Sequence, residues 1–156
     1  FNIDYFIRYI KSFDRQHRDS SIDVVACDVN QFHSVNERYG RQFGDLVLRS
    51  IGHTMRRLAR KTGGLGCRQG GDTFLLYCPH QEHYDQLLQK FLADVFVEKE
   101  TAHKVSLRFG VFEHAERERD IEKRLEFAIK AADSAQEYPD KLYCLYDYET
   151  GSSDPR

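Results

Sequence analysis

The chain has 156 residues, enough for one ordinary domain. Its 23 Lys and Arg against 25 Asp and Glu give a formal charge of −2, which argues against a polyanion-binding module and predicts no nucleic-acid partner. Eleven Phe and nine Tyr predict a packed core rather than a disordered chain. The sequence has neither an apolar run of about 18 residues nor a signal peptide, so we expect a cytoplasmic domain without membrane insertion. Because it lacks an initiator Met, we expect a piece of a longer protein.

The first half of the chain predicts helices and strands in alternation. Apolar residues at helical spacing predict a helix over residues 3–16, and a β-branched run predicts a buried strand over 22–29. A short helix over 31–38 and a longer one over 45–60 follow, each ending near glycine. Strands over 65–68 and 73–78 flank two adjacent glycines and predict a β-hairpin.

The second half predicts a helix over 84–95, a strand over 105–111, a helix over 118–137 and a strand over 142–146. Irregular alternation with a hairpin predicts an α+β fold, in which helices flank a mostly antiparallel central sheet. We expect one domain over residues 1–148 and a tail or linker over 149–156.

The cysteines and two loop histidines carry little sign of a metal site. Cys27, Cys67, Cys78 and Cys144 stand among apolar neighbours without a C-x-x-C pair, and we interpret them as buried thiols. His80 and His83 have no Cys or third His close by in the sequence, so we interpret them as loop histidines.

Two acids occupy positions that suit chemistry. Asp28 ends the most apolar strand, and Asp72 follows Gly70-Gly71 in the hairpin turn. If the strand lies beside the hairpin, the two carboxylates converge, and paired oxygen ligands at a sheet edge suit Mg²⁺. The glycines would let a phosphate or ribose approach the backbone. The alternative is that Asp72 serves only the turn and Asp28 only caps a helix.

A longer pattern resembles the GGDEF (diguanylate cyclase) family, whose motifs read D-x-D/N-x-F-K-x-x-N-D-x-x-G-H-x-x-G-D and then R-Y-G-G-D/E-E-F. The segment Asn2-Ile-Asp-Tyr-Phe6 also looks like the end of the family's opening motif. The resemblance spans nearly the whole chain, and the positions that match are 28, 30, 32, 36, 40, 44, 45, 68, 70, 71, 72 and 74.

The resemblance implies a palm-like nucleotide-cyclase fold and the joining of two GTP molecules into cyclic di-GMP by a homodimer. By position it implies a Mg²⁺ site and a guanine site. Asp28, the Val29 carbonyl and Asp72 would hold the metal, with Asp72 the retained catalytic acid. Asn36 and Asp45 would bind guanine, and Gly70 and Gly71 would lie against the substrate.

Several positions depart from the family pattern. Thr73 replaces the motif's Glu, and His33 stands where the family carries a phosphate-binding Lys. In the C-terminal helix, Gln136 and Asp140 align with the Lys and Arg that grip phosphates. The R-x-x-D site that binds the product is absent, since residues 60–64 contain no Asp.

These departures favour a degenerate GGDEF domain that keeps a GTP site and regulates a neighbour, such as an EAL phosphodiesterase domain. One alternative is an active cyclase that tolerates Thr73. Another is a dimerisation or scaffold module that binds no nucleotide, in which Asn36 caps a turn and Asp45 caps the long helix.

Overall fold

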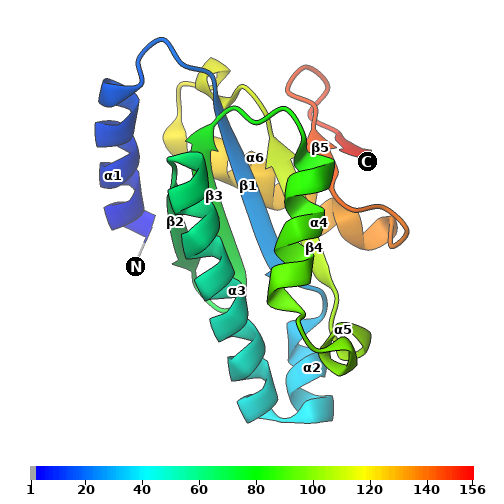
Figure 1. The fold of residues 1–156 in the computed structure, drawn as a ribbon. Coiled ribbons are helices and arrows are strands. Elements are labelled where there is room, and N and C mark those ends of the chain that lie inside the picture. The colour runs from blue at the N-terminus through cyan, green and yellow to red at the C-terminus, as the bar shows by residue number, and fades with distance from the viewer. Residues whose placement is uncertain (1–2) are drawn as a thin grey trace.

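Strand β1 (Ile22–Val29) lies at the centre of the sheet, and all eight of its residues are buried. The computed structural model describes residues 3–156, so Asn2 of the opening motif lies outside it. Within these residues six strands form one sheet in the order β2-β3-β1-β4-β5-β6 (Figure 1). A strand covered on both faces is apolar almost throughout, and the two exceptions in β1 are Asp23 and Asp28, one near each end.

The sheet is mostly antiparallel, as predicted. β3 (Thr73–Pro79) and β4 (Leu107–Phe112) pair antiparallel with its two edges, and β2 (Leu65–Gln69) pairs antiparallel with β3. Only the pairing of β5 (Cys144–Tyr146) with β4 is parallel within the described chain. The predicted α+β class with a mostly antiparallel sheet and flanking helices is confirmed.

Helices cover both faces of the sheet. α3 (Arg41–Thr62) and α4 (Tyr84–Val95) pack on the face that carries Val25 and Cys27, and α1 (Ile3–Gln16) and α6 (Ile121–Ser134) pack on the face that carries Val24 and Ala26 (Figure 1). Side chains of a strand alternate between faces, so Asp28 lies on the α6 side and Asp23 on the α4 side. The two buried acids therefore belong to different surroundings.

α6 approaches the sheet closely at Gly110 of β4. A Cβ at this position would lie 2.2 Å from the carbonyl oxygen of Ala128 and 2.2 Å from the backbone nitrogen of Ala132. The small residues on both elements permit this contact, and it fixes how near α6 lies to β1.

Some boundaries differ from those expected. α2 (Phe32–Tyr39) agrees with the predicted short helix, but α3 begins at Arg41 rather than at residue 45. The last helix is shorter than predicted and is flanked by the 3₁₀ turns η1 (Ala115–Arg117) and η2 (Ala135–Glu137). α5 (Lys99–Lys104) was not predicted, because none of its six residues is buried and it has no apolar periodicity.

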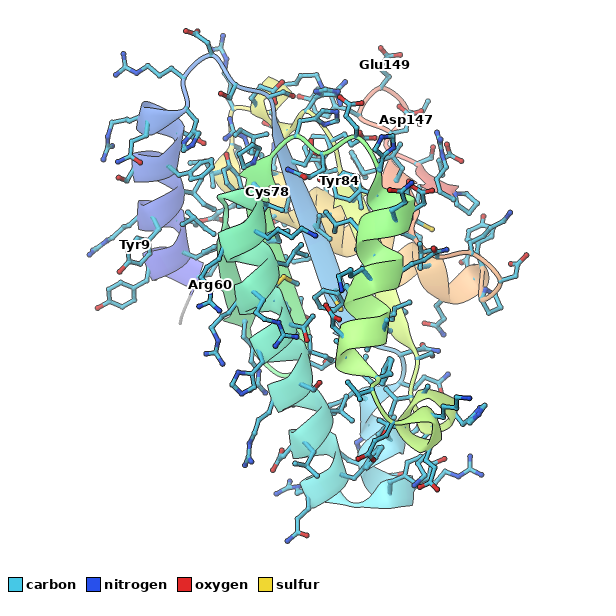
Figure 2. The ribbon with its side chains drawn as sticks, in the orientation of Figure 1. Tyr9, Arg60, Cys78, Tyr84, Asp147 and Glu149 are labelled. Carbon is cyan, nitrogen blue, oxygen red and sulfur yellow. The ribbon has the colours of Figure 1, made fainter. Side chains whose placement is uncertain are left out.

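The end of the chain is part of the sheet rather than an unpaired tail. β6 (Ser153–Pro155) pairs antiparallel with β5, and the connecting loop carries Asp147 and Glu149 (Figure 2). The Asp147 Oδ1 accepts a hydrogen bond from the Glu149 backbone N–H at 3.0 Å, and Gly151 has a φ of +69°. A strand of three residues is too short to show periodicity in the sequence, which is why it was not predicted.

The four cysteines are all free and buried, as expected, and Cys78 lies on β3 under the helices (Figure 2). No described helix is both long and apolar enough to cross a membrane.

Candidate functional site

The hairpin between β2 and β3 carries Gly70-Gly71-Asp72 past the end of β1. Gly70 adopts a φ of +56°, a left-handed conformation that glycine accepts at little cost. The Nε of Arg68 donates to the Gly71 carbonyl at 2.7 Å, and its guanidinium lies 5.8 Å from the centre of the Phe74 ring. Arg68 therefore holds the turn in place at the edge of the sheet.

The register between β1 and β3 brings Asp72 of the hairpin turn close to the end of β1 that carries Asp28. Cys27 of β1 pairs with Phe74, so the hairpin turn lies beside the last residues of β1. The backbone N–H of Val29 donates to Oδ2 of Asp72 at 3.0 Å. The strand lies beside the hairpin, and Asp72 lies beside the residue that follows Asp28.

Asp28 is engaged by a residue that the sequence did not single out. Arg108 stands directly opposite Asp28 on β4, and its Nε and one terminal nitrogen each donate to a different Asp28 oxygen at 2.7 Å. The side chains of Arg108 and Asp28 are 17% and 7% exposed, so this two-bond ion pair is largely shielded from water. Arg108 could have been noticed in the sequence as a charged residue in an otherwise apolar strand. Its partner, Asp28, follows only from the register of β4 against β1.

The electrostatics of the pair follow from its burial. Burial raises the pKa of the Asp28 carboxyl, while the hydrogen bonds from Arg108 lower it and the charge of Asp72 adds to the rise. The same hydrogen bonds raise the pKa of the Arg108 guanidinium. Arg108 is therefore a fixed positive charge at the base of the site.

Arg108 also reaches the C-terminal end of the α6 segment. Its other terminal nitrogen donates to Oε1 of Gln136 at 3.0 Å, and Asp133 lies 3.6 Å from the guanidinium. Gln136 is the residue that the resemblance aligns with a phosphate-binding Lys. Arg108 consequently links the carboxylate expected to hold a metal with a position expected to hold phosphate.

The arrangement does not fit Mg²⁺. A magnesium ion needs carboxylate oxygens that can approach it closely, together with several waters. Both Asp28 oxygens accept from a guanidinium, and one Asp72 oxygen accepts from Val29. A divalent cation bound to Asp28 would also lie against the positive charge of Arg108.

The other departures from the family pattern lie around this pair. Thr73 is the first residue of β3, half-buried next to Asp72. The side chain of His33 is 86% exposed, and its Nε2 lies 2.8 Å from Glu37 one turn later in α2. Asp140 is exposed in the loop that follows η2. Neither His33 nor Asp140 is joined to the Asp28–Arg108 pair by a contact within the described chain.

Asn36 of α2 lies against Gly44 of α3, the residue that precedes Asp45. The Asn36 Oδ1 is buried and accepts no hydrogen bond from any described residue. A Cβ on Gly44 would lie 2.0 Å from this oxygen, so the close approach of α2 and α3 depends on that glycine. Asn36 therefore presents an unpaired amide oxygen beside the α3 residue that precedes Asp45.

Capping does not account for these two residues. Gly40 precedes α3 as its N-cap and Asp45 lies a full turn inside the helix, where its side chain is exposed. Gln31 is the N-cap of α2, and Asn36 lies within that helix. The capping alternative for both residues is wrong.

A cavity of about 430 Å³ extends from Asp45 along α3 and over β2. Its floor includes Gly66 and Phe74 of the hairpin. Several side chains that line it can carry positive charge, which suits an anionic ligand: Arg49, His53, Arg56 and Arg68.

The segment before β2 excludes the side chain that a product site of the family type would need. A Cβ at Gly64 would lie 2.6 Å from the Tyr77 carbonyl oxygen and 2.6 Å from Cβ of Cys78. An Asp at this position would therefore displace β3, in agreement with the absence of R-x-x-D.

Two more buried side-chain oxygens without a partner in residues 3–156 belong to this end of the sheet, Asn30 Oδ1 after β1 and Gln69 Oε1 at the end of β2. Unpaired polar atoms are costly in a protein interior unless a ligand or water satisfies them. Together with the cavity and the Gly-Gly turn, they mark one edge of the sheet of this α+β domain as the candidate site.

Comparison with known proteins identifies the family. Residues 2–140 match the family described as "Diguanylate cyclase, GGDEF domain", and the chain belongs to this family. It is 32% identical over 65 residues to the diguanylate cyclase VdcA of Vibrio cholerae, a match that covers 42% of this chain and 19% of that protein. The chain thus spans a minor part of this relative.

Solved structures support the fold. The GGDEF domain of DgcB from Caulobacter crescentus, solved in complex with c-di-GMP, aligns with a TM-score of 0.70 at 18% identity over 88% of this chain and 84% of that chain. The GGDEF domain of the PA2567 protein from Pseudomonas aeruginosa aligns with a TM-score of 0.70 at 18% identity over 94% and 95% of the two chains. The palm-like GGDEF fold predicted from the sequence is confirmed.

Proposed function

We propose that this GGDEF domain has weak or no cyclase activity and acts in cyclic di-GMP signalling as a regulatory module that binds GTP through a guanine pocket. The observation that carries the proposal is the ion pair of Arg108 with Asp28, in which both Asp28 oxygens accept hydrogen bonds at 2.7 Å. We take the reaction class from the relatives, which are diguanylate cyclases. We infer low turnover from the side chains of this chain.

Attack of a ribose hydroxyl on a phosphate depends on positioning and on neutralisation of phosphate charge. Arg108 supplies one positive charge, but Asp28, Asp133 and Gln136 already engage its nitrogens. Thr73 has no charge to assist removal of the hydroxyl proton, and Asp140 repels phosphate. Binding of a nucleotide is thus better supported than its conversion.

We assign guanine to Asn36 and Asp45, of which Asp45 lines the cavity. The unpaired oxygen of Asn36 needs a donor, and the edge of guanine offers an amino group and an N1–H. The exposed carboxylate of Asp45 accepts from the same edge, and the cavity that begins at Asp45 continues past arginines able to face phosphates. A site that pairs buried polar atoms with the ligand discriminates against analogues without those groups.

We further propose that the domain is one unit of a longer cytoplasmic signalling protein, works as a homodimer, and transmits GTP occupancy to a neighbour such as an EAL domain. The boundary proposed from the sequence, residue 148, moves to the end of β6, because Ser153–Pro155 pair with β5.

The test combines an activity assay with a binding assay. The protein is incubated with GTP and Mg²⁺ or Mn²⁺ and the products are separated by chromatography, and GTP binding is measured by calorimetry. We expect GTP binding with little or no cyclic di-GMP, and loss of binding in Asn36→Ala and Asp45→Ala. Ser34→Ala, an exposed position on α2, serves as the control.

Turnover at rates typical of the relatives would overturn the degenerate assignment in favour of an active cyclase. Absence of GTP binding at millimolar concentration would overturn the sensing role and favour the scaffold alternative. In that case Asn36→Ala and Asp45→Ala would leave the regulation of a neighbouring domain unchanged.

A further inference from the structure

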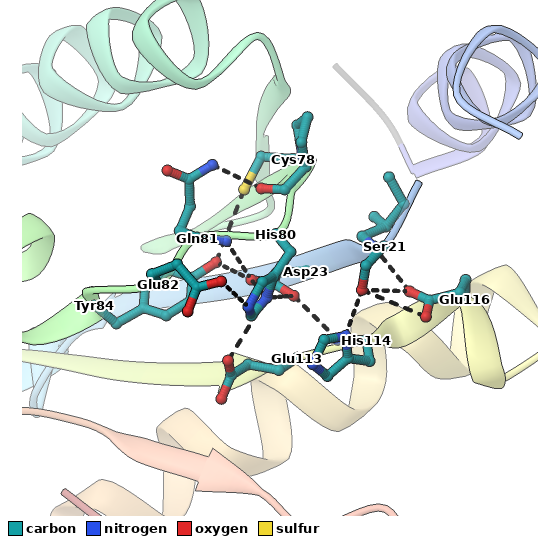
Figure 3. A network of polar contacts seen from close by, with 12 residues as sticks. Ser21, Asp23, Cys78, His80, Gln81, Glu82, Tyr84, Glu113, His114 and Glu116 are labelled. Carbon is teal, nitrogen blue, oxygen red and sulfur yellow. Dashed lines mark hydrogen bonds and ion pairs between the residues drawn. The ribbon is translucent and has the colours of Figure 1, made fainter. Parts of the chain in front are cut away.

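A second polar cluster lies at the first residues of β1, at the opposite end from the Gly-Gly turn (Figure 3). The Asp23 carboxylate is fully buried there. It accepts from Nδ1 of His80 at 2.9 Å, from the hydroxyl of Tyr84 at 2.5 Å, and from the backbone N–H groups of Gln81 and His114 at 3.0 Å each. Its oxygens are therefore satisfied by protein donors.

Two histidines that are far apart in the sequence meet at this cluster. The rings of His80 and His114 stack with centroids 4.5 Å apart and an angle of 26°. Nδ1 of His80 is held by Asp23, and Nδ1 of His114 is held by the hydroxyl of Ser21. The Ser21 hydroxyl also lies 3.3 Å from a Glu116 oxygen.

This pattern of partners is the one that orients metal-binding histidines. A carboxylate or hydroxyl on one ring nitrogen fixes the plane of the imidazole and leaves the other nitrogen for a cation. Here each ring has its Nδ1 fixed from the start of β1. Nε2 of His80 faces a further carboxylate, with Oε1 of Glu82 at 3.5 Å.

We propose that His80, His114 and Glu113 form a binding site for a divalent cation of the zinc type. Each of the three residues offers one ligand atom, and the three atoms lie within 4.8 Å of one another. Two imidazoles and one carboxylate are a typical ligand set for Zn²⁺, whereas Mg²⁺ prefers oxygen ligands only. The site is separate from Asp28 and Asp72, which lie at the other end of the sheet.

Binding of an ion requires the stacked imidazoles to turn, because a ring nitrogen binds a metal in the plane of its ring and the planes of His80 and His114 are only 26° apart. Zn–N bonds of about 2.1 Å in a tetrahedral shell place ligand atoms about 3.4 Å apart, so the ligand atoms must also draw together. Glu113 and His114 have room to move, because the side chain of Glu113 is 31% exposed and His114 is exposed. Glu82, whose side chain is 79% exposed, or a water completes the shell.

The charge balance also favours a cation. Nδ1 of His80 lies 2.9 Å from Oδ2 of Asp23 and 3.6 Å from Oε2 of Glu113, so two carboxylates approach this imidazole. A cation among these groups would offset the repulsion between the carboxylates. Because His80 follows β3 and Glu113 and His114 follow β4, the ion would tie together two loops at this end of the sheet.

The experiment uses protein stripped with EDTA and titrated with Zn²⁺ alone, followed by calorimetry and by the thermal midpoint. His80→Asn keeps an amide donor for Asp23 but removes Nε2. His114→Asn suits the left-handed backbone, whose φ is +55°, and also removes the ligand. His83→Asn is the matched control, because His83 is an exposed N-cap of α4 where Asn is well accepted.

We expect one Zn²⁺ per chain in the unaltered protein and in His83→Asn, with a higher midpoint in the presence of the ion. Affinity should fall at least about tenfold in His80→Asn and in His114→Asn, and by less in Ser21→Ala. If His80→Asn does not fold, Glu113→Gln carries the same test, since its side chain is partly exposed. Absence of stoichiometric binding, or binding unchanged in the double variant of His80 and His114, would overturn the site.

Discussion

The guanidinium of Arg108 donates to both carboxylate oxygens of Asp28, across two neighbouring strands of the central sheet. A buried pair of this kind contributes little net stability, but removal of one partner leaves an uncompensated charge and costs about 3–5 kcal/mol. The pair therefore acts mainly on the site: it fixes a positive charge at the carboxylate that the family resemblance assigns to a metal.

Replacement of Arg108 should convert Asp28 into a metal ligand. In Arg108→Ser the Asp28 carboxylate loses its counter-charge, so we expect a lower thermal midpoint that Mn²⁺ restores in part, and Mn²⁺ binding that calorimetry detects. The unaltered protein should show neither the lower midpoint nor Mn²⁺ binding at this site. Arg119→Ser, at an exposed position, is the control and should behave like the unaltered protein. Arg108→Ser/Asp28→Asn should lose the Mn²⁺ response; a response that survives would place the ion elsewhere.

Restoration of the motif Glu should not suffice for activity. Thr73→Glu adds a carboxylate next to Asp72 but leaves Arg108 on Asp28, so we expect no more than a small rise in cyclic di-GMP formation. The double variant Arg108→Ser/Thr73→Glu should exceed the sum of the two single variants, because both changes act on one site. Full activity of Thr73→Glu alone would show that Arg108 does not limit the reaction.

Gly44 should control the guanine pocket. In Gly44→Ala the new methyl group would lie 2.0 Å from Asn36 Oδ1 and displace it, so GTP affinity should fall about tenfold by calorimetry. Gln42→Ala is the control on α3, since Gln42 is exposed and does not line the cavity, and it should leave GTP affinity unchanged. Equal GTP affinity in Gly44→Ala would remove Asn36 from the pocket.

Gly110 should be essential for packing. In Gly110→Ala the Cβ would collide with the α6 backbone, which cannot rotate away as a side chain can, so the free energy of unfolding should fall by about 3 kcal/mol or more. Gly66→Ala on β2 would meet its nearest atoms, in the side chains of Met55 and Ala59 and the Leu75 carbonyl, at 3.4 to 3.7 Å and should cost much less. Urea unfolding curves of the two variants make the comparison, and similar midpoints would contradict the contact.

The thiols should react slowly in the folded protein. Burial raises the pKa of Cys67 to about 12 and of Cys78 to about 12, so the reactive thiolate is scarce near neutral pH. With a thiol reagent, the rate should rise about tenfold per pH unit through the range where an ordinary thiol with a pKa of about 8.5 levels off. Urea-unfolded protein gives the full count of four thiols as the control. Rapid labelling of the folded protein, or a rate that levels off like that of a free thiol, would contradict the burial.

Much of the fold followed from local pattern. The β-branched run of β1, the glycines of the hairpin and the apolar stripes of the helices predict elements that the structure contains, because periodicity and turn chemistry act within a few residues. β6 and α5 were missed, since short exposed segments have no periodicity and depend on neighbours that are distant in the sequence.

The motif residues Asp28, Asn36, Asp45 and Gly70 to Asp72 could be found in the sequence, because each lies in a segment whose spacing is itself the signal. Tertiary structure alone decided what surrounds them. Arg108 is 80 residues from Asp28 and His114 is 34 residues from His80, so strand register and loop position, rather than spacing, bring these side chains together. A net charge of −2 describes the whole chain. The fold decides where a guanidinium or an imidazole meets a buried carboxylate, because burial and distance set the strength of a charge interaction.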